Sequence, residues 1–138
     1  LKKMSKSELS DLSRINLTDE KDQIINKIKK AKTDPLPLPT TTKDLESRPE
    51  AKNLIGIYSS LTSTPLEKII SEFGGKNFSE FKEKLSQTVV DKIIPISVEI
   101  KKLLNDKKYL DEILSDGCNK ADAIASKKIK KIHEIVGF

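Results

Sequence analysis

The 138-residue sequence has no tryptophan, one cysteine, one histidine and only five glycines. A single cysteine, Cys118, excludes an intrachain disulfide framework and a zinc site made of thiolates. A single histidine, His133, excludes a multi-histidine metal centre, and five glycines are few for a turn-rich all-β protein. No apolar run approaches the roughly 20 residues of a membrane span, and no secretory signal is visible. These absences favour a helical protein in a reducing, cytoplasmic setting.

Charge is abundant where aromatic residues are scarce. Charged residues make up 34% of the sequence and aromatic residues 4%, so we expect a core of isoleucine, leucine and valine. The formal net charge is +5, and almost all the basic residues are lysines. A modest positive charge favours a polyanionic partner without identifying one.

Apolar residues recur with helical spacing in five segments, and no segment alternates like a strand. We expect the helices to start at Thr18 (ending near Thr33), at Ser47-Arg48-Pro49-Glu50, at Thr64-Pro65-Leu66-Glu67 (ending at Gly74), at Asn77 (ending near Asn105) and near Lys107 (ending at Gly137). The long helices are expected to pair antiparallel. The sequence therefore predicts an all-α fold, an antiparallel bundle of about five helices.

Two segments do not fit the helical pattern. Residues 1–17 are expected to form a loop with about one helical turn. Residues 35–47 alternate proline with leucine, which favours an extended, polyproline-like connection. The leucines indicate that this connection lies against a surface, and a loose linker is the alternative.

The last predicted helix carries one apolar stripe along nearly its full length. Cys118 lies on that stripe, so a buried structural thiol is expected rather than a nucleophile. Gly117 is interpreted as a point of close approach between helices. His133 is expected at the surface near the helix end. Four lysines near the end could meet phosphates, although a solubilising surface is the alternative: Lys127, Lys128, Lys130 and Lys131.

Residues 3–7 read Lys-Met-Ser-Lys-Ser, or KMSKS. Two ammonium groups three residues apart can reach one triphosphate, and the small hydroxyl residues between them allow backbone N–H groups to approach. Such a clamp stabilises the charge on departing pyrophosphate without a proton donor. A basic, disordered terminus is the alternative for so short a motif.

Taken together, several segments resemble bacterial tryptophanyl-tRNA synthetase, a family of class I aminoacyl-tRNA synthetases. The matching pieces are KKMSKS at 2–7, SRINLTDEKDQIINKIKKAKTDP at 13–35, RPEAKNLIGIYSSLT at 48–62, EFGGKNFSEFKEKL at 72–85 and the tail at 109–138. The resemblance covers essentially the whole chain. The INL, RPE..NL..IY and G...A..IA patterns favour the tryptophan enzyme over its tyrosine relative.

The resemblance implies that residues 3–7 form an ATP-binding loop at the edge of a Rossmann catalytic domain. Lys3 and Lys6 would contact the ATP phosphates, Ser5 and Ser7 would supply hydrogen-bond donors, and Met4 would pack near the adenine. Mg²⁺ would accompany ATP, with no metal bound by this chain itself. The family usually has Asp after KMSKS where this sequence has Glu8, a departure that concerns the anchoring of the loop.

The resemblance also implies a division of the chain. Residues 1–17 would hold the KMSKS loop and the end of the catalytic domain, and residues 18–138 would form the helical domain that binds the anticodon region. The parent enzyme would be a homodimer that joins L-tryptophan to tRNA(Trp). The HIGH-type motif and the tryptophan pocket precede KMSKS in the family, so this chain alone is expected to be inactive. A non-catalytic RNA-binding module and a helical scaffold are the alternatives.

Overall fold

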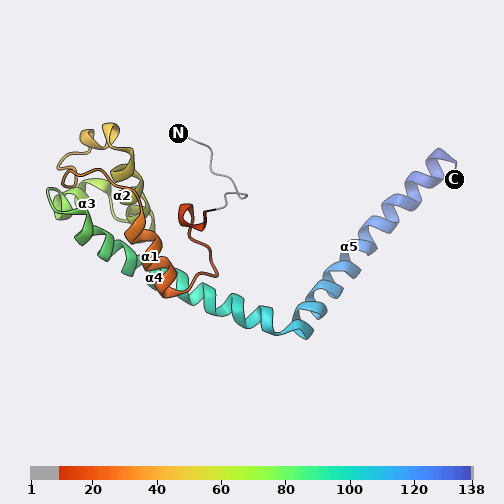
Figure 1. The fold of residues 1–138 in the computed structure, drawn as a ribbon. Coiled ribbons are helices and arrows are strands. Elements are labelled where there is room, and N and C mark those ends of the chain that lie inside the picture. Colours follow the sequence, from red (N-terminus) through yellow and green to blue (C-terminus); the bar gives the residue numbers. More distant parts are fainter. Residues whose placement is uncertain (1–9, 138) are drawn as a thin grey trace. The chain divides into compact units, whose positions relative to one another are not determined.

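The computed structural model describes residues 10–137, which contain five α-helices, two short 3-10 helices and no strand (Figure 1). The elements are η1 (Asp11–Ser13), α1 (Lys21–Lys30), η2 (Lys43–Ser47), α2 (Pro49–Thr62), α3 (Leu66–Phe73), α4 (Phe78–Asn105) and α5 (Lys107–Val136). The predicted all-α class and the number of helices are confirmed. The chain forms two compact units that divide between Val98 and Glu99, inside α4.

The first unit buries one apolar face of each of α1, α2, α3 and the first half of α4. Most of the buried side chains are aliphatic, as expected from the composition: Ile24, Ile28, Leu38, Leu45, Leu54, Ile55, Ile69, Ile70, Leu85, Val89 and Val90. Leu38 and Leu45 come from the connection between α1 and α2, so this connection contributes to the core.

Three aromatic rings form a cluster inside this core, which the scarcity of aromatic residues did not predict. Tyr58 of α2, Phe73 of α3 and Phe81 of α4 meet edge to face, with ring centroids 5.2 to 5.9 Å apart. Such pairs add about 0.5–1.5 kcal/mol each beyond the area that they bury. The core is therefore mostly aliphatic, as expected, with an aromatic cluster at the junction of these three helices.

The first helix begins later than Thr18. Its N-cap is Glu20, which forms a reciprocal capping box with Gln23, and the Glu20 backbone N–H donates to Gln23 Oε1 at 2.8 Å. Asp19 is buried and bonded to Asn16 and Lys27, so the chain is still turning at that point. The helix ends at Lys30, with Ala31 as its C-cap, three residues before the predicted end. The position of the N-cap was thus set by a tertiary contact.

The proline-rich connection lies against the first unit. Leu38 is 2% exposed, its N–H donates to the Lys76 carbonyl at 2.8 Å, and its carbonyl accepts from the Gly75 N–H at 2.9 Å. Arg48 donates to both Asp34 carboxylate oxygens and to two carbonyls of the connection. The interpretation as a segment laid on a surface is confirmed, and the loose linker is excluded. The expected extended form was wrong for the end of the connection, because residues 43–47 form the 3-10 helix η2.

The second unit contains the end of α4 and the whole of α5. No residue of α5 is buried, so the expectation that Cys118 is a buried thiol was wrong: the side chain is exposed. A Cβ atom added to Gly117 would meet no described atom within 4 Å, so the expected close approach of a second helix is not seen there. A stripe of apolar residues shows which face of a helix can be buried, and it does not show what covers that face. His133 is exposed, as expected.

Candidate functional site

The KMSKS segment, Lys3 to Ser7, lies outside the described residues. The predicted roles of Lys3, Met4, Ser5, Lys6 and Ser7 therefore stay predictions. What the structure does describe is the segment that follows them, residues 10–19, and the way in which it is held on α1.

Residues 10–13 form a short turn directly after the undescribed segment. The Leu12 backbone N–H donates to Ser10 Oγ at 3.4 Å, which caps η1. Asp11, inside this turn, accepts from Asn16 Nδ2 at 3.0 Å and pairs with Arg14 at 3.1 Å. This confirms the expected loop with a single helical turn for the described part of residues 1–17.

A buried lysine ties this segment to α1. Lys27 Nζ lies 2.5 Å from Asp11 Oδ2 and 2.6 Å from Asp19 Oδ2. The Lys27 and Asp19 side chains are 7% and 6% exposed, whereas that of Asp11 is 49% exposed. Asn16 completes the arrangement, because its backbone N–H and its Nδ2 donate to the two Asp19 carboxylate oxygens at 2.9 and 3.2 Å. We call these four residues the Lys27 cluster.

The protonation states in the Lys27 cluster follow from burial and pairing. Burial alone would raise the pKa of Asp19, but the hydrogen bonds from Lys27 and Asn16 outweigh it, and the pKa is lowered. Burial alone would lower the pKa of Lys27, but the bonds to Asp11 and Asp19 outweigh it, and the pKa is raised. Hydrogen bonds from Lys27 and Asn16 likewise lower the pKa of Asp11. All three groups are thus held in their charged forms at neutral pH.

The sequence analysis missed this cluster, because it did not single out Lys27. The sequence nevertheless contains an indication that Lys27 is buried. Lys27 stands three residues after Ile24 and one before Ile28, beside the apolar face of α1, where a lysine must find a partner if it is buried. The cluster fixes residues 11–19 to the helix with three charges and an amide.

The predicted phosphate-contacting lysines all lie exposed on α5: Lys127, Lys128, Lys130 and Lys131. We call them the α5 lysines. None of the four is engaged in an ion pair within the part of the chain that the structure describes. At about 100° per residue they spread over nearly half of the helix circumference, so at most three can face one partner. They form an exposed positive surface on this helix.

Residues 10–137 contain neither a candidate metal-binding cluster nor a helix that could span a membrane. That range holds no group of three or more His, Cys, Asp or Glu side chains placed to bind a metal ion. None of its helices combines the length and the apolar composition needed to cross a bilayer.

Comparison with known families decides the classification. The family model described as tRNA synthetases class I (W and Y) matches residues 1–92, which is more than half of the chain. The chain belongs to the class I tRNA synthetases. The matched stretch of this synthetase chain includes the KMSKS segment, the Lys27 cluster, α1 to α3 and the first half of α4.

Individual curated relatives extend the match to the whole synthetase chain. It is 48% identical over 137 residues to the tryptophan–tRNA ligases of Mesorhizobium japonicum and Agrobacterium fabrum, and 48% identical over 138 residues to that of Rickettsia felis. These alignments cover 99–100% of this chain and 39–41% of the relatives. The chain therefore spans about two fifths of the length of the curated relatives that it matches.

Proposed function

We propose that this chain is the C-terminal part of a tryptophan–tRNA ligase, which uses ATP to join L-tryptophan to tRNA(Trp). The observation that carries the proposal is the 48% identity over 99% of the chain to proteins of that name. Residues 1–17 would complete the ATP site and residues 18–138 would bind the anticodon region of the tRNA. The whole enzyme would be a cytoplasmic homodimer.

In the proposed first step, a carboxylate oxygen of tryptophan attacks the α-phosphorus of ATP. The bond from that phosphorus to the bridging oxygen breaks, and pyrophosphate leaves with the electron pair. Lys3 and Lys6 would bind the departing phosphates and offset the charge that develops on them, so neither has to transfer a proton. Ser5 and Ser7 would add hydrogen-bond donors, and Met4 would pack near the adenine. Mg²⁺ would enter bound to the ATP phosphates.

In the proposed second step, a terminal ribose hydroxyl of tRNA(Trp) attacks the carbonyl carbon of the adenylate and AMP leaves. The helical part would hold a distant region of the same tRNA. The formal charge of +5 and the exposed α5 lysines support contact with a polyanion.

The Lys27 cluster supports a connection between these two roles. The segment that follows KMSKS is bonded to α1 through Lys27, Asp11 and Asp19, so the ATP-binding segment would be attached to the RNA-binding part by a short, ordered stretch. A movement of the helical part would then be passed to the KMSKS segment through few residues.

The test is tryptophan-dependent ATP–pyrophosphate exchange, measured on a chimera that joins this chain to the remaining N-terminal part of the Rickettsia felis relative. Lys6→Ala should lower exchange about 100-fold or more, since one preorganised contact to developing charge has that magnitude. Lys2→Ala, which removes a neighbouring lysine outside the motif, is the matched control and should stay close to wild type.

Two results would contradict the proposal. Full activity of the Lys6→Ala chimera would show that Lys6 does not have the phosphate-binding role proposed for it. A wild-type chimera that folds, as judged by circular dichroism, but shows no exchange would contradict the function itself.

A further inference from the structure

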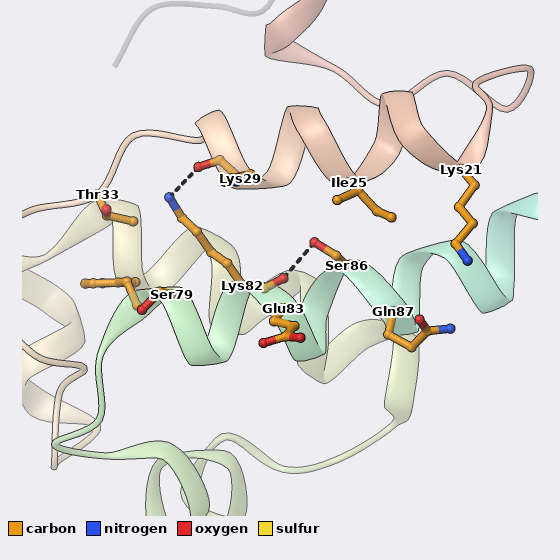
Figure 2. A pocket seen from close by; sticks show the side chains of 10 residues that line it. Lys21, Ile25, Lys29, Thr33, Ser79, Lys82, Glu83, Ser86 and Gln87 are labelled. Atoms are coloured by element: carbon orange, nitrogen blue, oxygen red, sulfur yellow. Dashed lines mark hydrogen bonds between the residues drawn. The ribbon is translucent and has the colours of Figure 1, made fainter.

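A groove of about 670 Å³ lies between α1 and the first half of α4, entirely within the first unit (Figure 2). Three lysines line it: Lys21 and Lys29 from α1, and Lys82 from α4. In Figure 2, Lys21 marks one end of the groove, and Lys82 reaches across to the C-terminal end of α1 at the other. The sequence analysis did not single out any of the three.

The two α1 lysines are exposed, and neither side chain is engaged with another residue in the range 10–137. They stand eight residues apart, which places them roughly 12 Å apart along the helix axis. By contrast, Lys52 pairs with Glu46 and Lys76 pairs with Glu80. Lys21 and Lys29 therefore present uncompensated charge to whatever enters the groove.

Lys82 has a different role, because its position is fixed. Its Nζ donates to the Lys29 carbonyl at 3.2 Å, at the end of α1 (Figure 2), and to the Ala31 carbonyl at 2.5 Å. An ammonium group has three N–H donors, so one remains after these two bonds. Desolvation by burial lowers the pKa of Lys82, because it disfavours the charged ammonium group. A bound anion would offset this cost of burying the charge.

The groove holds one carboxylate, Glu83, so its lining carries a net charge of three minus one, or +2. The hydroxyls of Thr33 and Ser79 also line it, and neither is engaged with another described residue. Phe78 is 8% exposed, which leaves little of its ring for a base to stack on. The lining thus suits a phosphate backbone better than an unstacked base.

We infer that this groove binds the sugar–phosphate backbone of tRNA, with Lys21 and Lys29 contacting phosphates and Lys82 closing one end. The inference rests on the proposed function, and it names the surface on which that function meets RNA. A polynucleotide places successive phosphates at both ends of the groove, whereas one small anion would have to draw the two α1 side chains together. Because backbone contacts position RNA without reading its sequence, binding here is independent of the anticodon bases.

The experiment measures the affinity of the 138-residue chain for a tRNA(Trp) transcript by fluorescence anisotropy, from about 0.05 to 0.5 M salt. The variant Lys21→Gln/Lys29→Gln removes the two lysines that make no contact within the described chain, so it should fold normally. The matched control is Lys43→Gln/Lys68→Gln, which removes two exposed lysines of η2 and α3 that lie outside the groove and make no described ion pair.

We expect the slope of log K against log salt to shrink by about 1.4–1.8 in the groove variant, at about 0.7–0.9 for each lost phosphate contact. If the two lines meet near 1 M salt, the Kd at about 0.1 M rises about 25- to 60-fold. The control pair should keep the wild-type slope. Each single groove variant should show about half of the change, which serves as a check if the double variant is unstable.

A groove variant with the same slope as the control pair overturns this inference and leaves the proposed function standing. A wild-type chain without salt-dependent binding overturns the inference together with the RNA-binding part of the proposal. Pyrophosphate exchange by the wild-type chimera judges the ATP-dependent part separately, because that reaction contains no tRNA.

Discussion

Replacing Lys27 with methionine should destabilise the first unit strongly, although it removes only one side-chain nitrogen and its charge. Methionine keeps much of the unbranched stem, but Asp19 is then left 5% exposed without its cation. Breaking a buried ion pair from one side costs about 3–5 kcal/mol. We expect about 3 kcal/mol here, at the low end of that range, because the other carboxylate, Asp11, is half exposed and can return to water.

Urea unfolding measures this loss on the first unit alone. The chain has two tyrosines and no tryptophan. Tyr58 is 7% exposed in the core of the first unit, whereas Tyr109 is 46% exposed on α5. In a Tyr109→Phe background, tyrosine fluorescence therefore reports on the first unit. At a slope of about 1–3 kcal/mol per M, a loss of about 3 kcal/mol lowers the midpoint by at least about 1 M urea.

Two comparison variants make the Lys27 result specific. Lys30→Met removes an exposed lysine of the same helix and should change stability by less than about 0.5 kcal/mol. Lys27→Met combined with Asp19→Asn removes both buried charges and should be more stable than Lys27→Met alone. A Lys27→Met variant within about 0.5 kcal/mol of wild type would refute the reasoning.

The same pair predicts a pH dependence whose sign can be worked out. The pKa of Asp19 is lowered in the folded chain, so its contribution is present above its usual value near 3.8 and is lost as pH falls through the lowered folded value. The pKa of Lys27 is raised, so its contribution is present below its usual value near 10.5 and is lost as pH rises through the raised folded value.

Between these limits the contribution of the Asp19–Lys27 pair to the stability of the wild-type chain is constant. In Lys27→Met, burial opposes the Asp19 charge with only Asn16 to hold it, so protonation in acid relieves the penalty. The stability difference between wild type and Lys27→Met should therefore narrow as pH falls from about 7 to about 3. A difference that stays constant over this range would show that the cost comes from packing rather than from charge.

Two further predictions concern a glycine pair and the α5 lysines. Gly74→Ala should destabilise the first unit by about 1–3 kcal/mol, because the new Cβ would lie 2.5 Å from the Ile70 carbonyl oxygen and 3.1 Å from that of Pro39. At Gly56, in the interior of α2, a new Cβ would meet nothing within 4 Å outside the backbone of its own helix, so Gly56→Ala should stabilise the unit by about 0.5–1 kcal/mol. Equal urea midpoints for the two variants would contradict both expectations. Replacing the four α5 lysines with glutamine should shrink the salt slope of tRNA(Trp) binding by about 2, since up to three can face one partner. An unchanged slope would support the alternative that these lysines only make the surface soluble.

The sequence was sufficient to predict a helix where the local pattern of apolar residues agrees with the residues that the fold buries. The helical spacing of apolar residues predicted the helices α2 and α3 and the first half of α4, and Pro49 lies in the first turn of α2 as expected, although the N-cap is Arg48. It was insufficient where a contact between distant residues decides the local structure. Thr18 has the composition of an N-cap, yet the helix begins after Glu20, because Asp19 is bonded to a lysine eight residues further along.

The candidate sites divide in the same way. A motif such as Lys-Met-Ser-Lys-Ser can be read without a fold, because its chemistry lies within five consecutive residues. The groove could not be read from the sequence. Lys21 and Lys82 are 61 positions apart, and each alone resembles the many lysines that only solvate a helix. What distinguishes them is that the packing of α1 on α4 brings both into one groove, where two carbonyls of the α1 end fix Lys82. A lysine-rich sequence therefore predicts that a polyanion is bound, whereas only the fold indicates which lysines are left to bind it.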